Sequence, residues 1–559
     1  MATHRRTSKI LVRGLVAAGL ALPIALPSSA FGASPATFKA QQASVKRLTA
    51  AVRMTKDDPS PTRAFTGPTT MAIDPQNSRV IVAASADLRT RTCYLLRSTD
   101  AGHTWHIPGP ATPALKSYPY CTTTASAGAS QAAIAFGRNG TLYYALGGYG
   151  NGEGANDGLN SVLLARSTDL GNTWSTVLVD NNRGATGPDA ATDSGVNGLA
   201  VDTSGPKDVV YVGFMQSFNN APKGSPLTAG AAVVSVSTDG GQTFAKPVNM
   251  NTFSHVTTDV SGTATPLIMQ SFFAGPFLSV HNGVVVAVSG STPAPGFSGS
   301  NTGTTALPLL EARSTDQGKS WTFSALGPPV FTGTGAQTGL GWTPLGGAQG
   351  TFVAVYSGTS ADASSSGTEN ILVQRSTDLG MTWSDPVIID DDDPSQLYTS
   401  FYPELGVAPD GRVDVVWEDN RGQANYHFLV HYTYSTDGGQ SWAPNVLVSD
   451  QPVNFGLGIS FNSDIRQPPG VASANEYAAF GWTDTRLSNA TTQSQDDFGT
   501  EAQFATLPAT HSTTLPVLAA VFAGLAGAGI ILLLVLMIRR RGEPKSAAPP
   551  ASTPEPDAA

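Results

Sequence analysis

Three separated segments of the chain repeat the pattern Asp-x-Arg. They are Asp87-Leu88-Arg89, Asp419-Asn420-Arg421 and Asp484-Thr485-Arg486. A guanidinium binds a carboxylate through two parallel hydrogen bonds, so a group of arginines is suited to hold an acidic ligand, and Arg466 is a fourth candidate for it. The alternative is that each arginine pairs with an aspartate of its own or a neighbouring repeat and stiffens a loop, because structural ion pairs are common.

Two further groups of side chains offer chemistry. Tyr402 and Glu404 lie close together in the sequence, and a tyrosine activated by a carboxylate can act as a nucleophile. The alternative is that this segment simply begins a strand. The run Asp390, Asp391, Asp392 and Asp393 is rich in the oxygen ligands that Ca²⁺ prefers. Its spacing matches no known calcium loop, so a solvated run of charge is the alternative, and the sequence predicts no other cofactor or metal.

One eight-residue phrase recurs six times, with the pattern Ser-Thr-Asp-x-Gly-x-Thr/Ser-Trp/Phe. Asp and Ser accept hydrogen bonds from nearby backbone N–H groups, and Gly supplies a positive φ where the chain reverses. The aromatic ring packs beneath the turn. Each copy therefore predicts a tight hairpin between short strands, in which the aspartate is structural. These aspartates are Asp100, Asp169, Asp239, Asp316, Asp378 and Asp437.

The phrase resembles the Asp box, or BNR repeat, of bacterial sialidases and of other propellers. The resemblance covers about residues 69–507 and implies an all-β propeller whose blades are four-stranded meanders. It also implies that each box joins the third and fourth strands of a blade, on the face away from the active site.

The number of blades follows from the repeats. Six boxes mark six blades, and the strand pattern starts again without a box at residues 466–472 and 477–482. A strand from residues 41–65 would complete this seventh blade and close the ring, which removes an exposed sheet edge. We expect seven blades, and the alternative is six blades, in which the last strands complete the first blade.

The meander also predicts where a site would form. Loops that follow second strands lie on the face opposite the boxes, and blades 6, 7 and 1 are neighbours in a seven-bladed ring. The three Asp-x-Arg units should therefore cluster on that face. The sialidase family carries a Phe/Tyr-Arg-Ile/Leu-Pro motif near its first blade, whereas the nearest match here is Ile465-Arg466-Gln467-Pro468 in the last blade. This departure favours binding over hydrolysis.

The two ends of the chain predict secretion and anchoring. Residues 1–32 have the basic start, apolar core and small residues of a signal peptide. Residues 515–538 are uncharged and long enough to span a membrane, and Arg539-Arg540-Arg541 follows, so residues 539–559 should be cytoplasmic. Between these ends we predict an N-terminal segment at 33–66, the propeller at 67–506 and a linker at 507–514.

The composition argues against one class of binding partner, nucleic acids. Charged residues make up 13% of the chain and its formal net charge is −9, which offers no basic face for a nucleic acid. Cys93 and Cys121 are the two cysteines, and outside the cell they are expected to form one disulfide. We therefore expect a cell-surface propeller that recognises carbohydrate or cell-envelope material. The alternative is a sialidase-type glycoside hydrolase acting on sialylated or related acidic sugars, and the sequence leaves open whether the protein is an enzyme.

Overall fold

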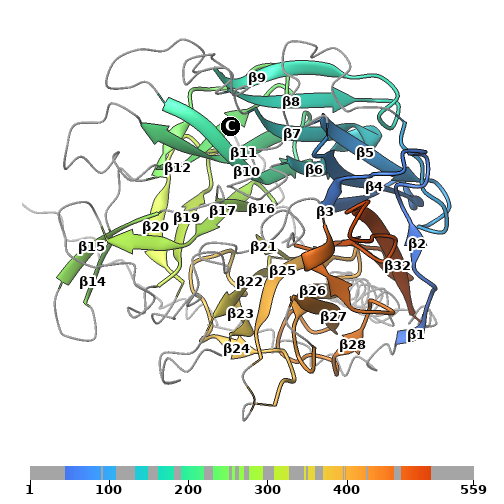
Figure 1. Cartoon of the computed structure of the whole chain (residues 1–559). Helices are drawn as coiled ribbons and strands as arrows, with labels where there is room; N and C mark the ends of the chain where they lie inside the picture. Colours follow the sequence, from blue (N-terminus) through green and yellow to red (C-terminus); the bar gives the residue numbers. More distant parts are fainter. Residues whose placement is uncertain are drawn as a thin grey trace, which may run out of the picture. The chain divides into compact units, whose positions relative to one another are not determined.

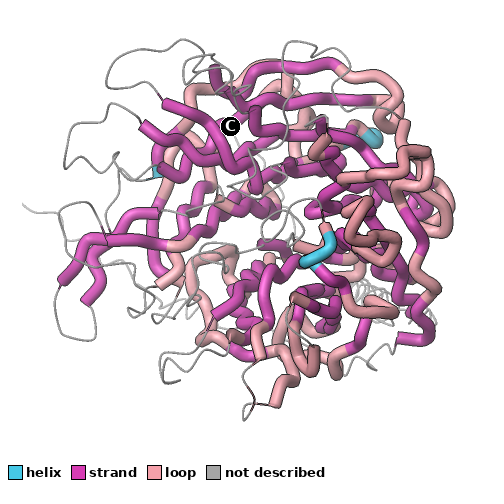
Figure 2. Tube along the Cα trace, in the orientation of Figure 1, coloured by secondary structure: helices cyan, strands magenta, loops and turns pink. Residues whose placement is uncertain are grey.

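The computed structural model describes residues 45–504, with gaps at 90–91, 109–131, 149–160, 182–190, 219–230, 251–254, 259–263, 270–275, 294–307, 327–344, 348–349, 359–368, 394–395, 397, 424–425 and 459–467. The predicted signal peptide, membrane span and cytoplasmic tail lie outside these residues. Within them, no helix is long and apolar enough to cross a membrane. Strands and loops make up almost all of the described chain (Figure 2), apart from single turns such as η1 (Arg138–Gly140) and η4 (Phe455–Leu457).

The strands form seven antiparallel blades in chain order (Figure 1). Blade 1 contains β3 (Phe65–Asp74), β4 (Asn77–Asp87) and β5 (Thr92–Ser98). Blade 2 contains β6 (Ala132–Phe136), β7 (Leu142–Gly148), β8 (Ser161–Ser167) and β9 (Ser175–Asn181). Blade 3 contains β10 (Ala191–Asp202), β11 (Val209–Phe218), β12 (Ala231–Ser237) and β13 (Val248–Asn249). Blade 4 contains β16 (Phe277–His281), β17 (Val284–Ser289), β19 (Leu310–Ser314) and β20 (Thr322–Ala325).

The remaining blades complete the ring. Blade 5 contains β21 (Leu345–Gly346), β22 (Phe352–Gly358), β23 (Asn370–Ser376) and β24 (Val387–Ile388). Blade 6 contains β25 (Ser400–Val407), β26 (Val413–Asp419), β27 (His427–Ser435) and β28 (Val446–Leu447), with β29 (Val453–Asn454) also paired to β27. Blade 7 contains β30 (Gly470–Ser473), β31 (Tyr477–Asp484) and β32 (Asp496–Phe504), completed by β1 (Val45–Leu48) and β2 (Val52–Arg53).

Ring closure comes from the N-terminal strand. β1 pairs antiparallel with β32, with Val45 opposite Phe504 and Leu48 opposite Ala502. The outermost strand of the last blade thus comes from the start of the described chain, and Figure 1 shows the blue β1 beside the red β32. The expectation of seven blades closed by a strand from residues 41–65 is confirmed, and the six-bladed alternative is wrong.

Apolar packing between blades holds the ring together. The described residues form seven buried hydrophobic clusters, one between each pair of neighbouring blades, including blades 7 and 1. Side chains alternate along each strand, so one strand serves two clusters. In β4, Val82 and Ala84 face blade 2, whereas Ile81 and Ala83 face blade 7.

The Asp boxes are hydrogen-bonded turns at the ends of third strands. In the first box the Ser98 hydroxyl donates to Asp100 Oδ1 (2.8 Å) and accepts from the Gly102 N–H (2.9 Å), while the Thr104 hydroxyl donates to Asp100 Oδ2 (2.6 Å). The other five boxes repeat this set of bonds. The aspartates therefore act as acceptors that fix the turn.

Each box also joins its blade to the preceding one. A Cβ on Gly171, in the box of blade 2, would lie 2.3 Å from Leu95 Cδ2 in blade 1, so only glycine allows this contact. Arg97 of blade 1 donates to the carbonyl of Leu170 (2.8 Å), and Arg313 of blade 4 does the same to Leu379 (2.6 Å). The boxes thus help to set how the blades pack.

One sheet lies outside the seven blades. β14 (His255–Thr258), β15 (Ala264–Met269) and β18 (Ser291–Pro293) form it, and the repeat pattern of the sequence does not predict it. β14 and β15 fall between blades 3 and 4, and β18 falls between the second and third strands of blade 4. It is an insertion into the repeat.

Candidate functional site

The Asp-x-Arg units lie at the opposite ends of the strands from the Asp boxes. β4 pairs with β5 so that Asp87 is opposite Thr92 and Ile81 is opposite Ser98, where the first box begins. Asp87, Asp419 and Asp484 end β4, β26 and β31, the second strands of blades 1, 6 and 7. The three units therefore share the face away from the boxes, on neighbouring blades.

Each unit is a compact turn in which the arginine folds back onto its aspartate. Arg486 donates its backbone N–H to Asp484 Oδ1 (2.7 Å) and its Nη2 lies 2.7 Å from Asp484 Oδ2. The Arg421 N–H donates to Asp419 (2.7 Å) and the Arg89 N–H donates to Asp87 (2.9 Å) in the same way. These aspartates are almost fully buried.

A second carboxylate reaches each arginine from the segment that enters its blade. Arg89 pairs with Asp58, which precedes β3, and Arg486 Nη2 lies 2.8 Å from Asp450, which lies between β28 and β29. Arg421 Nη1 lies 2.6 Å from Asp391, and its Nε lies 2.7 Å from Asp392. Each arginine therefore fastens the incoming crossover segment to the second strand of its own blade.

These contacts set the electrostatics of the face. Hydrogen bonding to Asp87 raises the pKa of Arg89. Burial alone would lower the pKa of Arg421 and Arg486, but bonds to Asp419 and Asp484 outweigh it, so both pKa values are raised. Every guanidinium stays charged and is shared by at least two carboxylates. A role for these arginines in binding a ligand carboxylate remains a prediction.

The acidic run beside Arg421 is partly buried. Burial, with a contribution from the neighbouring Asp392 charge, raises the pKa of Asp390 to about 7, and burial together with the Asp419 charge raises the pKa of Asp392 to about 6. Asp390 accepts a hydrogen bond from the Ile371 N–H (2.7 Å). Among the described residues, no group of three or more His, Cys, Asp or Glu side chains is arranged to hold a metal ion. Calcium at residues 390–393 stays a prediction.

Tyr402 and Glu404 lie on β25, the first strand of blade 6. The pairing of β25 with β26 shifts register between Phe401 and Glu404, and Tyr402 has a φ of 52° at this bulge. The Tyr402 ring packs edge-on against Phe401 at 5.4 Å, and Glu404 is buried. First strands contact each other around the ring, so this bulge lies on its inner side. The catalytic role predicted for the pair remains a prediction.

A pocket of about 500 Å³ opens beside the Arg89 unit. It is lined by Asp57, Asp58, Ser60, Phe65, Asp87, Arg89, Tyr94 and Ile107. The Arg89 guanidinium lies 5.6 Å from the Phe65 ring centre, and the Phe65 and Tyr94 rings meet edge to face at 5.8 Å. The pocket thus combines carboxylates, one guanidinium, a hydroxyl and aromatic walls.

Two predicted site residues cannot be placed. Arg466 and Cys121 lie outside the described residues. Cys93 is fully buried in β5 and is disulfide-bonded, and the sequence offers Cys121 alone as its partner.

Sequence reasoning named Asp391 and Asp392 only as calcium candidates, and it did not single out Asp58, Asp450 or the pocket. Asp58 and Asp450 lie in the segments that lead into blades 1 and 7, and nothing in their local sequence ties them to an arginine more than 30 residues away. The two share one signal in the sequence. Each is an aspartate in the segment that leads into a blade, and the second strand of that blade ends with an Asp-x-Arg unit.

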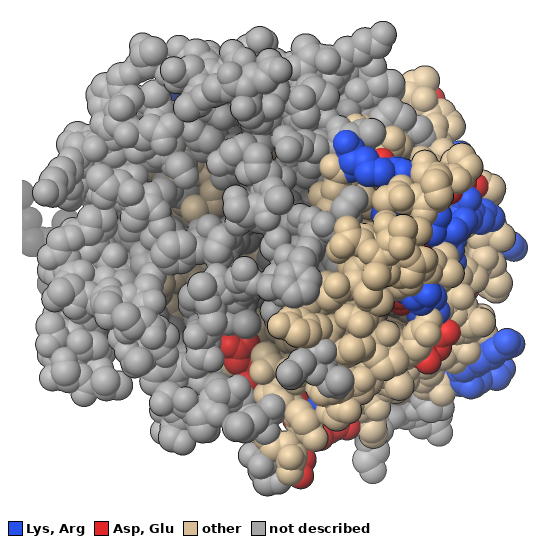
Figure 3. All heavy atoms as spheres, in the orientation of Figure 1, with Lys and Arg blue, Asp and Glu red and all other residues tan. Residues whose placement is uncertain are grey.

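On the side shown in Figure 3, the basic side chains of the described residues lie mostly at the right, with acidic side chains between them. Charges of both signs therefore alternate over this part of the surface.

Comparison with known proteins supports the assignment of the eight-residue phrase as an Asp-box repeat. The family model of the BNR/Asp-box repeat matches residues 433–444, the sixth box. No curated protein matches the chain. Similar solved structures include a Hadza microbial sialidase (12% identity, 78% of this chain and 75% of that chain, TM-score 0.41). They also include a polysaccharide lyase, an ulvan lyase (13% identity, 81% and 95%, TM-score 0.43), and an α-L-arabinanase of Penicillium chrysogenum (14% identity, 67% and 94%, TM-score 0.38).

The identification rests on the boxes and the ring. Six copies of one hydrogen-bonded turn, seven blades and a match to the repeat model agree with each other. The protein is therefore a seven-bladed β-propeller that carries BNR, or Asp-box, repeats.

Proposed function

We propose that the protein is a carbohydrate-binding propeller, and that it binds neutral or amine-bearing sugars at the pocket beside Arg89. The pocket carries the proposal. Sugar hydroxyls can donate to the carboxylates of Asp57 and Asp58 and accept from the guanidinium of Arg89. A few polar groups set among apolar walls are typical of small-molecule sites, and here Phe65 and Tyr94 supply the walls.

The charge of the pocket selects among sugars. Asp57, Asp58 and Asp87 outnumber Arg89 as charged groups in the lining. Burial opposes ionisation of Asp58, but hydrogen bonds from Ser60 outweigh it and hold the pKa of Asp58 below its ordinary value. The surplus negative charge repels a ligand carboxylate, so sialic acid is disfavoured while a neutral hydroxyl or an ammonium group is accepted. This separates the proposal from the alternative of a sialidase-type hydrolase.

A glycan array tests the proposal. Purified protein is applied to neutral, amine-bearing and sialylated glycans, beside Asp57→Asn and the control Asp385→Asn, an exposed acid in blade 5. We expect binding to neutral or amine-bearing glycans, about tenfold weaker affinity in Asp57→Asn, and no change in Asp385→Asn. Preferential binding to sialylated glycans, or equal binding by both variants and the unchanged protein, would overturn it.

The proposed location is the cell surface, with the propeller outside and the tail in the cytoplasm. The support is the predicted signal peptide at 1–32 and the predicted span at 515–538, which Arg539-Arg540-Arg541 follows. Cell fractionation tests it. We expect the full chain in the membrane fraction and a chain ending at residue 506 in the medium, and recovery of both in the soluble cell fraction would contradict it.

A further inference from the structure

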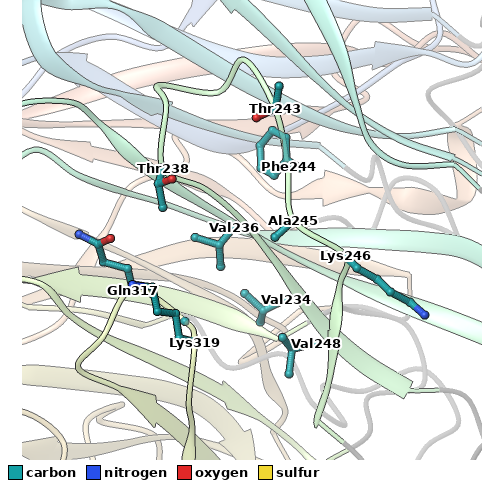
Figure 4. Close-up of a pocket in the computed structure, with 11 residues that line it drawn as sticks. Val234, Val236, Thr238, Thr243, Phe244, Ala245, Lys246, Val248, Gln317 and Lys319 are labelled. Carbon is teal, nitrogen blue, oxygen red and sulfur yellow. The ribbon is translucent and has the colours of Figure 1, made fainter.

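A second pocket, of about 590 Å³, lies between the third and fourth boxes. It belongs to the box face and is separate from the pocket beside Arg89. Its apolar lining comes from β12, β13 and the third box, namely Val234, Val236, Phe244, Ala245 and Val248. Figure 4 shows the three valines in the centre, with Gln317 and Lys319 on one side and Lys246 on the other.

The sequence explains why this blade differs. The third box ends in Phe244, whereas the other five boxes end in tryptophan. In the first and fourth boxes the indole N–H donates to the box glycine carbonyl, from Trp105 to Gly102 (2.9 Å) and from Trp321 to Gly318 (3.1 Å). Phe244 is smaller and has no such donor, so the third box leaves more room beside its ring.

Charge around this pocket is one-sided. Lys246 and Lys319 are exposed and line it, and no carboxylate does. The nearby box acids are turned into their own boxes, where Asp239 Oδ2 accepts from the Thr243 hydroxyl (2.6 Å) and Asp316 Oδ2 accepts from the Ser320 hydroxyl (2.6 Å). Within the described part of the chain, neither lysine ammonium takes part in an ion pair.

The concentration of lysine here is unusual for this chain. The described residues contain five lysines, namely Lys46, Lys56, Lys207, Lys246 and Lys319, and two of the five flank this pocket. An apolar floor favours a ligand with an apolar group, and two unneutralised ammonium groups favour an anion. We infer that this pocket binds an amphipathic anion, an acyl or aryl group that carries a carboxylate or sulfonate.

Fluorescence titration of the purified protein with anilinonaphthalene sulfonate tests the inference, with octanoate and octylamine as competitors. We expect saturable binding that octanoate displaces, that octylamine does not displace, and that weakens as salt is added. The double variant Lys246→Gln/Lys319→Gln should bind the probe about tenfold more weakly, while the control Lys207→Gln, also an exposed lysine, should not change.

Phe244→Trp provides a second, independent test because the larger ring occupies part of the pocket. It should weaken probe binding while the thermal unfolding midpoint stays the same or rises. Equal displacement by octanoate and octylamine, or unchanged probe affinity in the double variant with a normal unfolding midpoint, would overturn the inference. Glycan binding at the Arg89 pocket should be unaffected by all of these changes.

Discussion

At the scale of single residues, the carboxyl groups of the box turns and those buried between strands have pKa values shifted in opposite directions. Burial opposes ionisation of Asp239, but hydrogen bonds within its box outweigh it and lower the pKa to about 2, and hydrogen bonds from Ser320 lower the pKa of Asp316 to about 2. Burial raises the pKa of Asp497 to about 8 and that of Glu311 to about 7. The box aspartates therefore stabilise the fold as anions, whereas Asp497 is better tolerated when it is protonated.

Asp497→Asn tests this contrast. The folded pKa of Asp497 lies above its unfolded value, so its ionisation destabilises the fold progressively as pH rises from about 4 to about 8. An asparagine keeps the shape, and its side-chain oxygen can still accept the hydrogen bond that the Ser85 hydroxyl donates to Asp497 in the structure. We expect the variant to be more stable at pH 8, by at least about 1.4 kcal/mol, the free energy of one pKa unit, and the gain to vanish near pH 4.

Urea unfolding at pH 4, 6 and 8 measures this difference. A stability difference that does not change with pH would contradict the assignment, because an effect of packing alone does not depend on the ionisation of Asp497.

At the scale of elements, the arginine of each Asp-x-Arg unit links a crossover segment to a strand through ion pairs with a carboxylate on each. Removing Arg486 would leave the fully buried Asp484 without its guanidinium and release Asp450. We expect Arg486→Ala to lower the free energy of unfolding by about 3 kcal/mol, as for a buried ion pair that loses one partner. Arg79→Ala, an exposed arginine on β4, should change it little.

Chemical denaturation of both variants checks this expectation. The double variant Arg486→Ala/Asp484→Ala should recover part of the loss, since it leaves no unpaired buried charge. Wild-type stability in Arg486→Ala would show that the arginine is free to serve a ligand.

A substitution in the third box is expected to raise the free energy of unfolding instead of lowering it. In Phe244→Trp, an indole can reach the Gly241 carbonyl as Trp105 reaches that of Gly102. The added apolar area and hydrogen bond should raise the free energy of unfolding by about 1 kcal/mol. A calorimetric midpoint below that of the unchanged protein would contradict this account of the pocket.

At the scale of the whole molecule, closure of the ring depends on β1. A chain that begins at residue 50 keeps every box and β2 but lacks β1, so the end of β32 from Ala502 to Phe504 is left uncovered. An uncovered strand edge can pair with another chain. We expect this shortened chain to lose at least about 1 kcal/mol of stability and to associate as its concentration rises.

Light scattering against protein concentration measures the association, with a chain that begins at residue 44 as the control. If the shortened chain stays monomeric with an unchanged unfolding midpoint, β1 does not close the ring in solution.

The ring of blades could be predicted from the sequence because the patterns that specify its turns and strands are local and repeat along the chain. Each box carries its own turn chemistry, and the strands around Ile81 or Val413 alternate or run apolar within a few residues. The Asp-x-Arg units could be predicted from the sequence, but their second carboxylates could not. The ion pairs of Arg89 with Asp58 and of Arg486 with Asp450 join segments that meet only when the blades pack. The insertion β14–β15–β18 has no box, so no repeat marked it.

The central claim is that the arginines on the face opposite the boxes are held by the protein's own carboxylates, leaving a pocket suited to neutral or amine-bearing sugars. The most direct test is release of a fluorophore from a sialoside by the purified protein, beside Arg486→Ala. The account predicts no turnover by either protein, while both still bind neutral or amine-bearing glycans. Turnover by the unchanged protein that Arg486→Ala abolishes, with its fold intact by circular dichroism, would contradict the account and establish a hydrolase.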